Sequence, residues 1–234
     1  MKRLDYKLEG DLLIKAFPKH RIDERRELLI IMLETIRYIL IADKIDSNDT
    51  AQDRLVVYVD DMQRLFFFSS KKYYSIVLPF TLKIDKGIIE FYHKNMNIDA
   101  EIVSNTIMLL NSDVYNSQSC WDFITPIYDL EERNTNFWVF FSHLLNCDLG
   151  YLRFDEDENG FQEAQKRGIP NMHPKHHLDI NFSNSSTFKN GLSKKISQQD
   201  FIDIVDNKKN RKHPIKYTLY FHKIENSIST LVKS

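Results

Sequence analysis

The feature that most constrains the fold is a long apolar segment near the N-terminus, residues 24–43. Strong helix formers dominate this segment, and its apolar residues cover most of the circumference of a helix. These apolar residues are Leu28, Leu29, Ile31, Met32, Leu33, Ile36, Tyr38, Ile39 and Leu40. Glu34, Thr35 and Arg37 interrupt the run, which is therefore shorter than the ~20 mostly apolar residues that a membrane span needs. The pattern predicts a central, buried helix with Asp23 as its N-cap.

After residue 52 the chain changes to short runs rich in β-branched and aromatic residues, separated by short polar breaks. These runs are residues 55–59, 65–68, 73–84 and 88–92. The turn Asp85-Lys86-Gly87 joins the last two runs as a hairpin turn would. Pro79 indicates an edge strand or a bulge in the third run. The runs together predict an antiparallel meander.

Helical spacing returns in residues 100–110, whereas residues 119–130 are ambiguous. A helix is also expected at 137–145, after capping residues at 134–136, although its aromatic content would also suit a strand. A capping box at Ser197–Asp200 predicts a short helix. Further strands are expected at 149–155, 177–183 and 217–221.

Helices and strands come in blocks instead of alternating, which favours an α+β fold. We expect an antiparallel sheet, the meander plus C-terminal strands, packed against a central buried N-terminal helix and several shorter helices. The chain has 234 residues with no internal repeat and no long linker, so residues 1–234 are expected to form a single domain.

Composition places the chain among ordinary globular proteins, with 42% hydrophobic and 28% charged residues. Cys120 and Cys147 are the only cysteines and form no C-x-x-C pair, which excludes a cysteine-rich zinc cluster and suits a reducing compartment. The N-terminus shows no apolar signal-peptide region. We expect a soluble, cytoplasmic protein with no membrane partner.

The net charge of −1 conceals an asymmetry. Residues 161–234 carry 13 Lys and Arg against 6 Asp and Glu, a charge of +7, and the remaining 19 and 27 leave −8 for residues 1–160. The basic residues at 189–216 could contact nucleic acid or an acidic protein partner. They could equally fold back onto the acidic half of the same chain.

Several common functional motifs are missing from the sequence. The six glycines are too far apart for G-x-G-x-x-G or for a P-loop, which excludes nucleotide binding by those devices. G-x-S-x-G, H-E-x-x-H and EF-hand patterns are also absent. Most enzyme classes with a well-marked signature are therefore excluded.

Polar residues suited to chemistry concentrate between residues 148 and 206. The segments 149–155 and 177–183 alternate between apolar and polar residues, as half-buried strands do. If these strands pair, Arg153 and Asp155 come to lie beside His177, Asp179 and Asn181. Two carboxylates and an imidazole so placed can bind a divalent metal or transfer protons near neutral pH.

This arrangement defines the candidate site. The candidate catalytic residues are Asp155, His173, His177 and Asp179, of which Asp155, His177 and Asp179 are also the candidate metal ligands. The candidate binding residues are Arg153, Asn181, Lys189, Lys194 and Lys195. A solvent-facing strand would show the same alternation, however, and its ion pairs would contribute little to stability.

Other conspicuous residues favour structural roles. His143 lies on an apolar segment and is expected to be a buried core histidine. Trp121 and Trp138 are expected in the core, because no basic residues interleave with them at regular spacing.

Four blocks of the polar region resemble a known family. They are Leu152-Arg153-Phe154-Asp155, the run His173 to Ile180, the run Thr187 to Leu192, and Phe201-Ile202-Asp203-Ile204. Their order is similar to the R-F-D, H-P-K-x-H-L-D and F-K-x-G-L blocks of a family of uncharacterised bacterial proteins catalogued as a domain of unknown function. The residues that match are Arg153, Asp155, His173, Pro174, His177, Asp179, Lys189 and Gly191. The resemblance implies a bacterial cytosolic protein, an association with defence or mobile-element gene clusters, and no particular activity.

Three functions stay open at this point. The first is a non-catalytic accessory protein of a multi-gene, defence-related system, docking through the polar strand face and the basic C-terminal third. The alternative is a metal-assisted phosphodiesterase or nuclease that uses Asp155, His177 and Asp179. The third is a small-ligand sensor whose pocket the same residues line.

Overall fold

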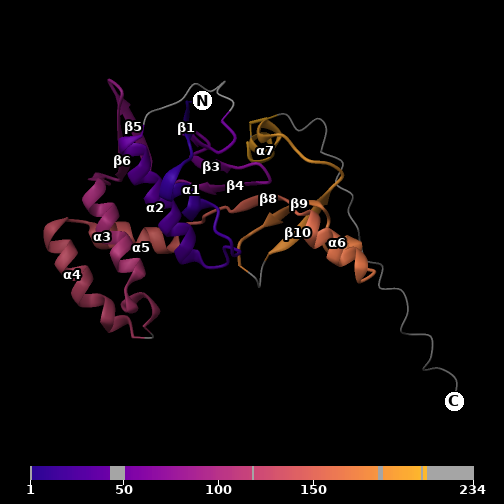
Figure 1. Ribbon diagram of the computed structural model, residues 1–234. Coiled ribbons are helices and arrows are strands. Elements are labelled where there is room, and N and C mark those ends of the chain that lie inside the picture. Colours follow the sequence, from indigo (N-terminus) through magenta and orange to yellow (C-terminus); the bar gives the residue numbers. More distant parts are fainter. Residues whose placement is uncertain (1, 43–50, 118, 184–186, 207, 210–234) are drawn as a thin grey trace, which may run out of the picture.

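A computed structural model describes residues 2–42, 51–117, 119–183, 187–206 and 208–209 (Figure 1). Its described part contains a seven-stranded antiparallel sheet, a three-stranded antiparallel sheet and α-helices, which confirms the α+β prediction. No helix in this part of the chain is long and apolar enough to cross a bilayer.

The strands and helices have the following bounds. The strands are β1 (Arg3–Lys7), β2 (Arg54–Tyr58), β3 (Arg64–Phe68), β4 (Lys72–Val77), β5 (Thr81–Asp85), β6 (Ile88–His93), β7 (Met96–Asn97), β8 (Leu152–Glu156), β9 (His176–Ile180) and β10 (Phe188–Leu192). The α-helices are α1 (Gly10–Ala16), α2 (Arg25–Ile41), α3 (Ala100–Asn111), α4 (Ile124–Arg133), α5 (Phe137–Asn146), α6 (Glu158–Lys166) and α7 (Gln198–Val205). Three 3₁₀ helices are η1 (Asp113–Asn116), η2 (Cys120–Phe123) and η3 (Pro170–Met172).

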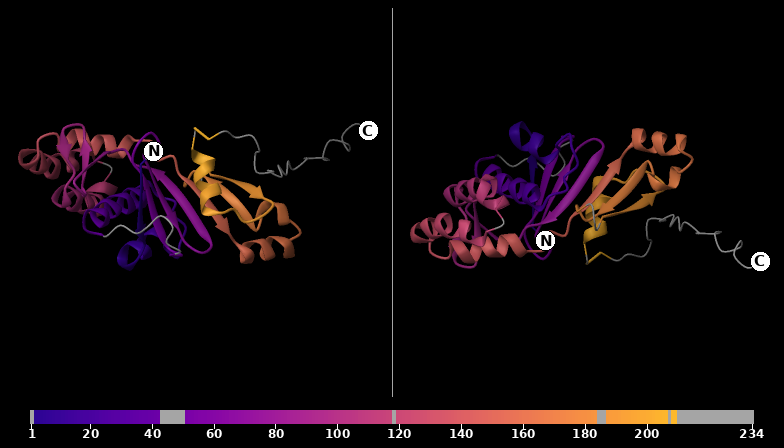
Figure 2. Two further views of the ribbon diagram at one scale, coloured as in Figure 1. Left: turned by 90° about the horizontal axis from the view of Figure 1, so that it is seen from above. Right: turned by 90° about the horizontal axis from the view of Figure 1, so that it is seen from below.

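The large sheet has the order β1-β2-β3-β4-β8-β9-β10, and the small sheet has the order β5-β6-β7. Strand β8 pairs with β4 across a long insertion, with Ser75 opposite Leu152. The insertion carries the small sheet and helices α3, α4 and α5, which lie away from α6 and β10 in all three views (Figures 1 and 2). The two polar strands, whose pairing the sequence left open, do pair, because β8 lies beside β9.

Two apolar cores lie on opposite faces of the large sheet. Helix α2 packs into the larger core, and Leu28, Met32 and Ile36 on it are fully buried, which confirms the predicted central helix. Its N-cap is Glu24 instead of Asp23. The second core, on the other face, contains Phe66, Phe68 and Phe154 together with residues of α7. The capping box predicted at the start of α7 is present.

Some local predictions are confirmed and others need correction. The run 73–84 is two strands in different sheets, β4 and β5, because Pro79 lacks the amide hydrogen that a continuous ladder requires. The hairpin turn is confirmed, with φ of 48° at Lys86 and 90° at Gly87. The ambiguous segment 119–130 is helical from Cys120 onward, and the helix expected at 137–145 is confirmed as α5. The strand expected at 217–221 lies outside the described residues.

Predictions about three aromatic side chains were wrong. Trp121 is 75% exposed and Trp138 is 52% exposed, so neither is a core residue. His143 is also exposed and stacks on the buried ring of His93, with 4.9 Å between ring centroids. Aromatic content shows that a helix has an apolar side, but it does not fix which aromatics face inward.

Candidate functional site

The register of the last three strands brings the predicted polar residues together. Arg153 lies opposite Asp179, and Asp155 lies opposite His177, across the β8–β9 pair. On the other side of β9, Lys189 of β10 lies opposite Asp179. Alternation along each strand therefore places all five side chains on one face of the sheet. We call this group, Arg153, Asp155, His177, Asp179 and Lys189, the Asp179 cluster.

The Asp179 cluster is buried, so this strand face is not a solvent-facing surface. Four of its members are 9% exposed or less: Arg153, Asp155, His177 and Asp179. The segment between α6 and β9 covers the imidazole of His177. The carbonyl oxygen of Pro174 is hydrogen-bonded to this ring, and the ring centroid of His173 lies 5.1 Å from its centroid. Pro18 and His20, which follow α1, line a small cavity together with Arg153.

Two cations and two carboxylates balance each other within the cluster. The Arg153 Nε donates to Asp155 Oδ2 at 2.7 Å, and its Nη2 donates to Asp179. Lys189 Nζ lies 3.1 Å from Asp179 Oδ1. Burial alone would raise the pKa of Asp179, but Arg153 and Lys189 outweigh it and the pKa lies below its usual value. Both carboxylates are thus paired with cations, as buried charges must be.

The orientation of His177 fixes which of its nitrogens faces the acids. Its Nδ1 lies 2.8 Å from the backbone carbonyl oxygen of Pro174. A carbonyl can only accept, so Nδ1 carries the proton and the Nε2 lone pair is directed into the cluster. Burial, followed by the charge of Lys189, lowers the pKa of His177, so the ring is neutral at pH 7. Lys189 Nζ donates to Nε2 at 2.8 Å.

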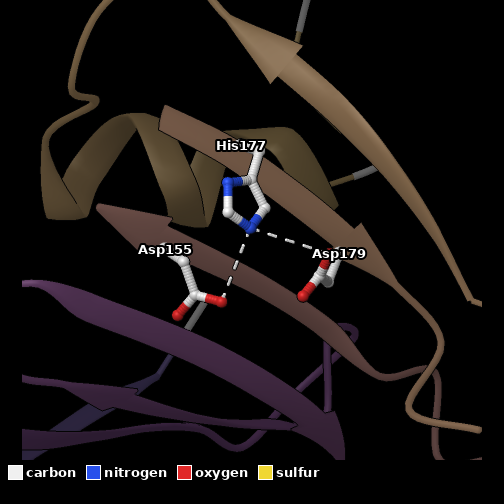
Figure 3. Close-up of side chains that lie close together, drawn as sticks. All are labelled: Asp155, His177 and Asp179. Atoms are coloured by element: carbon white, nitrogen blue, oxygen red, sulfur yellow. Dashed lines mark ion pairs between the residues drawn. The ribbon is translucent and has the colours of Figure 1, made fainter. Parts of the chain in front are cut away.

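Three residues of the cluster could hold a metal ion. Ligand atoms of Asp155, His177 and Asp179 lie within 4.8 Å of one another, and Nε2 is 3.8 Å from one oxygen of each carboxylate (Figure 3). Ligands bound about 2.1 Å from one ion lie about 3–3.4 Å apart, so a modest side-chain rotation closes the gap. A backbone carbonyl at Nδ1 is also the usual outer partner of a metal-bound histidine. Lys189 stands in the same space, and its side chain is 28% exposed.

The other predicted site residues lie around this group or away from it. His173 is close to His177, but its Nε2 faces Asp157 Oδ2 at 2.7 Å. The side chain of Asp157 itself caps helix α6. Lys195 bonds to Glu156 at 2.9 Å and Lys194 is exposed, so neither reaches the Asp179 cluster.

Asn181 does not extend the polar face as predicted. Strand β9 ends at Ile180, and Asn181 has a φ of 68°, which takes the chain out of the alternation. Asn181 lines a groove with Arg25 and Arg64 at the start of β8, at the end of the strand away from Asp155. These two arginines were not predicted as site residues, because each lies far from the polar region in sequence.

No known relative identifies the protein. No family model matches the chain, and no curated protein or solved structure shows significant similarity to it. The resemblance to an uncharacterised bacterial family therefore stays a prediction. Any functional conclusion rests on the geometry of this chain.

Proposed function

We propose that the protein binds a divalent metal at Asp155, His177 and Asp179 and uses it to hydrolyse a phosphoester. The observation that supports this most directly is the His177 lone pair, which is held toward two buried carboxylates by the bond from Nδ1 to Pro174. One nitrogen and two oxygens suit Mn²⁺, Fe²⁺ or Zn²⁺, and three protein ligands leave positions open for water and substrate.

Lys189 has a specific role in this proposal. Without metal, its ammonium lies between Nε2 and Asp179 and takes the place of the ion. With a metal held by Asp155, His177 and Asp179, the Lys189 ammonium would lie nearer to solvent, where it would anchor a substrate phosphate. Arg153 stays bonded to both carboxylates and keeps them in place.

The remaining residues supply proton transfer. A metal held by Asp155, His177 and Asp179 would supply an activated water as the nucleophile at neutral pH. His173, oriented by Asp157, lies beside the cluster and would donate a proton to the leaving group.

The test measures metal binding and turnover on the same variants. Thermal shift with Mn²⁺, Mg²⁺, Zn²⁺ or a chelator should show stabilisation of the wild type and none of His177→Gln. Hydrolysis of bis(4-nitrophenyl) phosphate should fall about a hundredfold or more in that variant. His176→Gln is the matched control, because His176 stacks on Phe154 on the other face of the sheet and should keep both properties. Metal binding without hydrolysis would support the metal site but contradict the proposed hydrolase activity.

A second function, docking onto a protein partner, is supported by a different observation. Trp121, Ile124 and Tyr128 follow one another at spacings of three and four, which places them on one side of η2 and α4, and all three are exposed. Trp138 at the start of α5 is also exposed. Exposed aromatic groups of this kind are typical of protein interaction sites.

This second proposal is tested by a pull-down from a bacterial lysate. The wild type should retain a partner that the double variant Trp121→Ser and Trp138→Ser loses, with no change in melting temperature. A wild type that retains nothing beyond the double variant would contradict it.

Nucleic-acid binding by residues 189–216 stays a prediction, and residues 207 and 210–216 of this range lie outside the described residues. Within the described part, four lysines of this range are paired with carboxylates: Lys189, Lys195, Lys208 and Lys209. A mobility-shift titration at two salt concentrations tests it, since phosphate contacts weaken steeply with salt.

A further inference from the structure

A groove of about 670 Å³ lies at the end of the large sheet opposite to Asp155 and His177. It lies between the start of β8, the end of β9 and the C-terminal turn of α7, which contributes Ile204 and Val205. Its volume falls in the range of small-molecule sites, which is about 300–1,000 Å³. Two arginines, Arg25 and Arg64, stand among these mainly apolar walls.

Arg64 is a half-buried cation that forms no close ion pair in the described part of the chain. Its Nη2 donates to the carbonyl oxygen of Gly150 and, at 3.2 Å, to Ser75 Oγ. Its Nε is buried and has no hydrogen-bond partner among the described residues, and no carboxylate of that part lies within 4 Å of the guanidinium. Burial lowers the pKa of Arg64 to about 10, so the group remains charged at pH 7. The carboxylate of Asp148 lines the same groove and acts to raise the pKa of Arg64, although burial outweighs it, and the two groups form no ion pair within 4 Å.

Arg25 on α2 repeats this arrangement. Its Nη2 donates to the carbonyl oxygens of Leu144, at 3.3 Å, and of Cys147. Its Nε is also buried without a partner, and it forms no ion pair in the described part of the chain. These bonds hold the connection from α5 to β8. They use one terminal nitrogen of each guanidinium and provide no counter-charge for either arginine.

We propose that this groove binds a small anionic ligand, a phosphate or carboxylate attached to an apolar body. Arginine presents paired N–H donors that match an oxyanion, and a buried guanidinium gains most from such a partner. The apolar body would contact Leu149, Ile180, Ile204 and Val205, which line the same groove. The site is separate from the Asp179 cluster, so this inference does not depend on the proposed hydrolase.

The experiment is isothermal titration calorimetry of the protein with four probes: phenyl phosphate, benzoate, inorganic phosphate and phenol. Phenyl phosphate or benzoate should bind, and the comparison of the two identifies the preferred head group. Inorganic phosphate should bind more weakly and phenol should not bind detectably, since each lacks one half of the proposed ligand. Binding should weaken with added salt.

Matched variants locate the binding. Arg25→Gln should raise the dissociation constant about tenfold or more, whereas Arg26→Gln should leave it unchanged, because Arg26 on the same helix faces Glu24 and Tyr115 outside the groove. Val205→Trp keeps both arginines and fills the groove, and it should also abolish binding. Circular dichroism confirms that each variant is folded.

Two results would overturn the inference. If none of the anions binds to the wild type, the arginines serve only to hold residues 144–150. If Arg25→Gln and Val205→Trp bind the probes as tightly as the wild type, the anion binds elsewhere on the protein.

Discussion

The large sheet carries two buried ionic groups, and they differ in what they can do. The first, the Asp5 cluster, is Asp5 with Arg3 and Arg54 on β1 and β2. The second is the Asp179 cluster on β8, β9 and β10. They lie near opposite edges of the sheet and on opposite faces, since Asp5 is paired with Val56 of one core and Arg153 with Tyr74 of the other.

The difference lies in the chemical groups and not in burial. In the described part of the chain, the Asp5 cluster contains one carboxylate, whose oxygens accept from Arg3 and Arg54, and it contains no imidazole. A guanidinium has no lone pair for a metal and does not lose its proton. The Asp179 cluster has two carboxylates, an imidazole lone pair and one partly exposed ammonium. Burial of charge alone therefore does not mark a functional site, whereas this combination is what a metal site requires.

The largest effect is expected from removing the central carboxylate of each cluster. Asp179→Ala and Asp5→Ala should each lower the free energy of unfolding by about 3–5 kcal/mol, because each leaves buried cations unpaired. Urea denaturation in the presence of a chelator measures both. A loss below about 1 kcal/mol for Asp179→Ala would mean that Arg153 and Lys189 are hydrated in the variant. The two clusters would then differ in how much their central carboxylate stabilises the fold.

Removing the outermost cation of each cluster should separate them. Lys189→Met removes the ammonium that competes with a metal, so the affinity for Mn²⁺ should rise about tenfold, which corresponds to about 1.4 kcal/mol. Arg3→Gln, at the matching position of the Asp5 cluster, should leave Mn²⁺ affinity unchanged. Equal affinities in the two variants and the wild type would show that Lys189 does not occupy the metal position.

The smallest effect concerns pH. The pKa of His177 is lowered in the folded protein, so the unfolded chain binds a proton more readily. The stability contributed by the neutral ring is present above the unfolded pKa of about 6.5 and is lost as pH falls below it. Unfolding measured with a chelator at pH 7 and pH 5 should show a loss larger by about 1 kcal/mol in the wild type than in His177→Gln. An identical loss in both would indicate that the pKa of His177 is the same in the folded and the unfolded chain.

The contribution of Asp179 to stability changes in a lower range of pH than that of His177, so the two contributions can be measured separately. Its folded pKa is lowered, so its stabilisation is present above the unfolded pKa of about 3.9 and is lost only as pH falls further.

The strand face of the site could be predicted from the sequence because side chains alternate with a fixed period of two. That period alone places Asp155, His177 and Asp179 on one face once β8 and β9 pair. The depth of the site could not be predicted, since it depends on residues 170–175 folding back over His177. The position of Lys189 also depends on the register of β10, which no local pattern specifies.

The pairing of strands that are far apart in the sequence also could not be predicted from local patterns. The central helix and the hairpins β2–β3, β3–β4 and β5–β6 are local patterns that the sequence indicates, although the predicted meander is divided between two sheets. The pairing of β4 with β8, in contrast, joins segments separated by the whole insertion. The groove at Arg25 and Arg64 depends on that pairing, because Arg64 reaches the carbonyl of Gly150 only when β8 lies beside β4. A site assembled in this way has no signal in its sequence spacing.

The most direct test of the central claim is to count bound Mn²⁺ by electron paramagnetic resonance during titration of the metal-free protein. One ion per chain should bind to the wild type, and one to the Asp5→Asn variant if it remains folded. No ion should bind to Asp179→Asn, which keeps the shape of the side chain and removes its charge. Stoichiometric binding that persists in Asp179→Asn, or its absence in the wild type, would contradict a metal site at Asp155, His177 and Asp179.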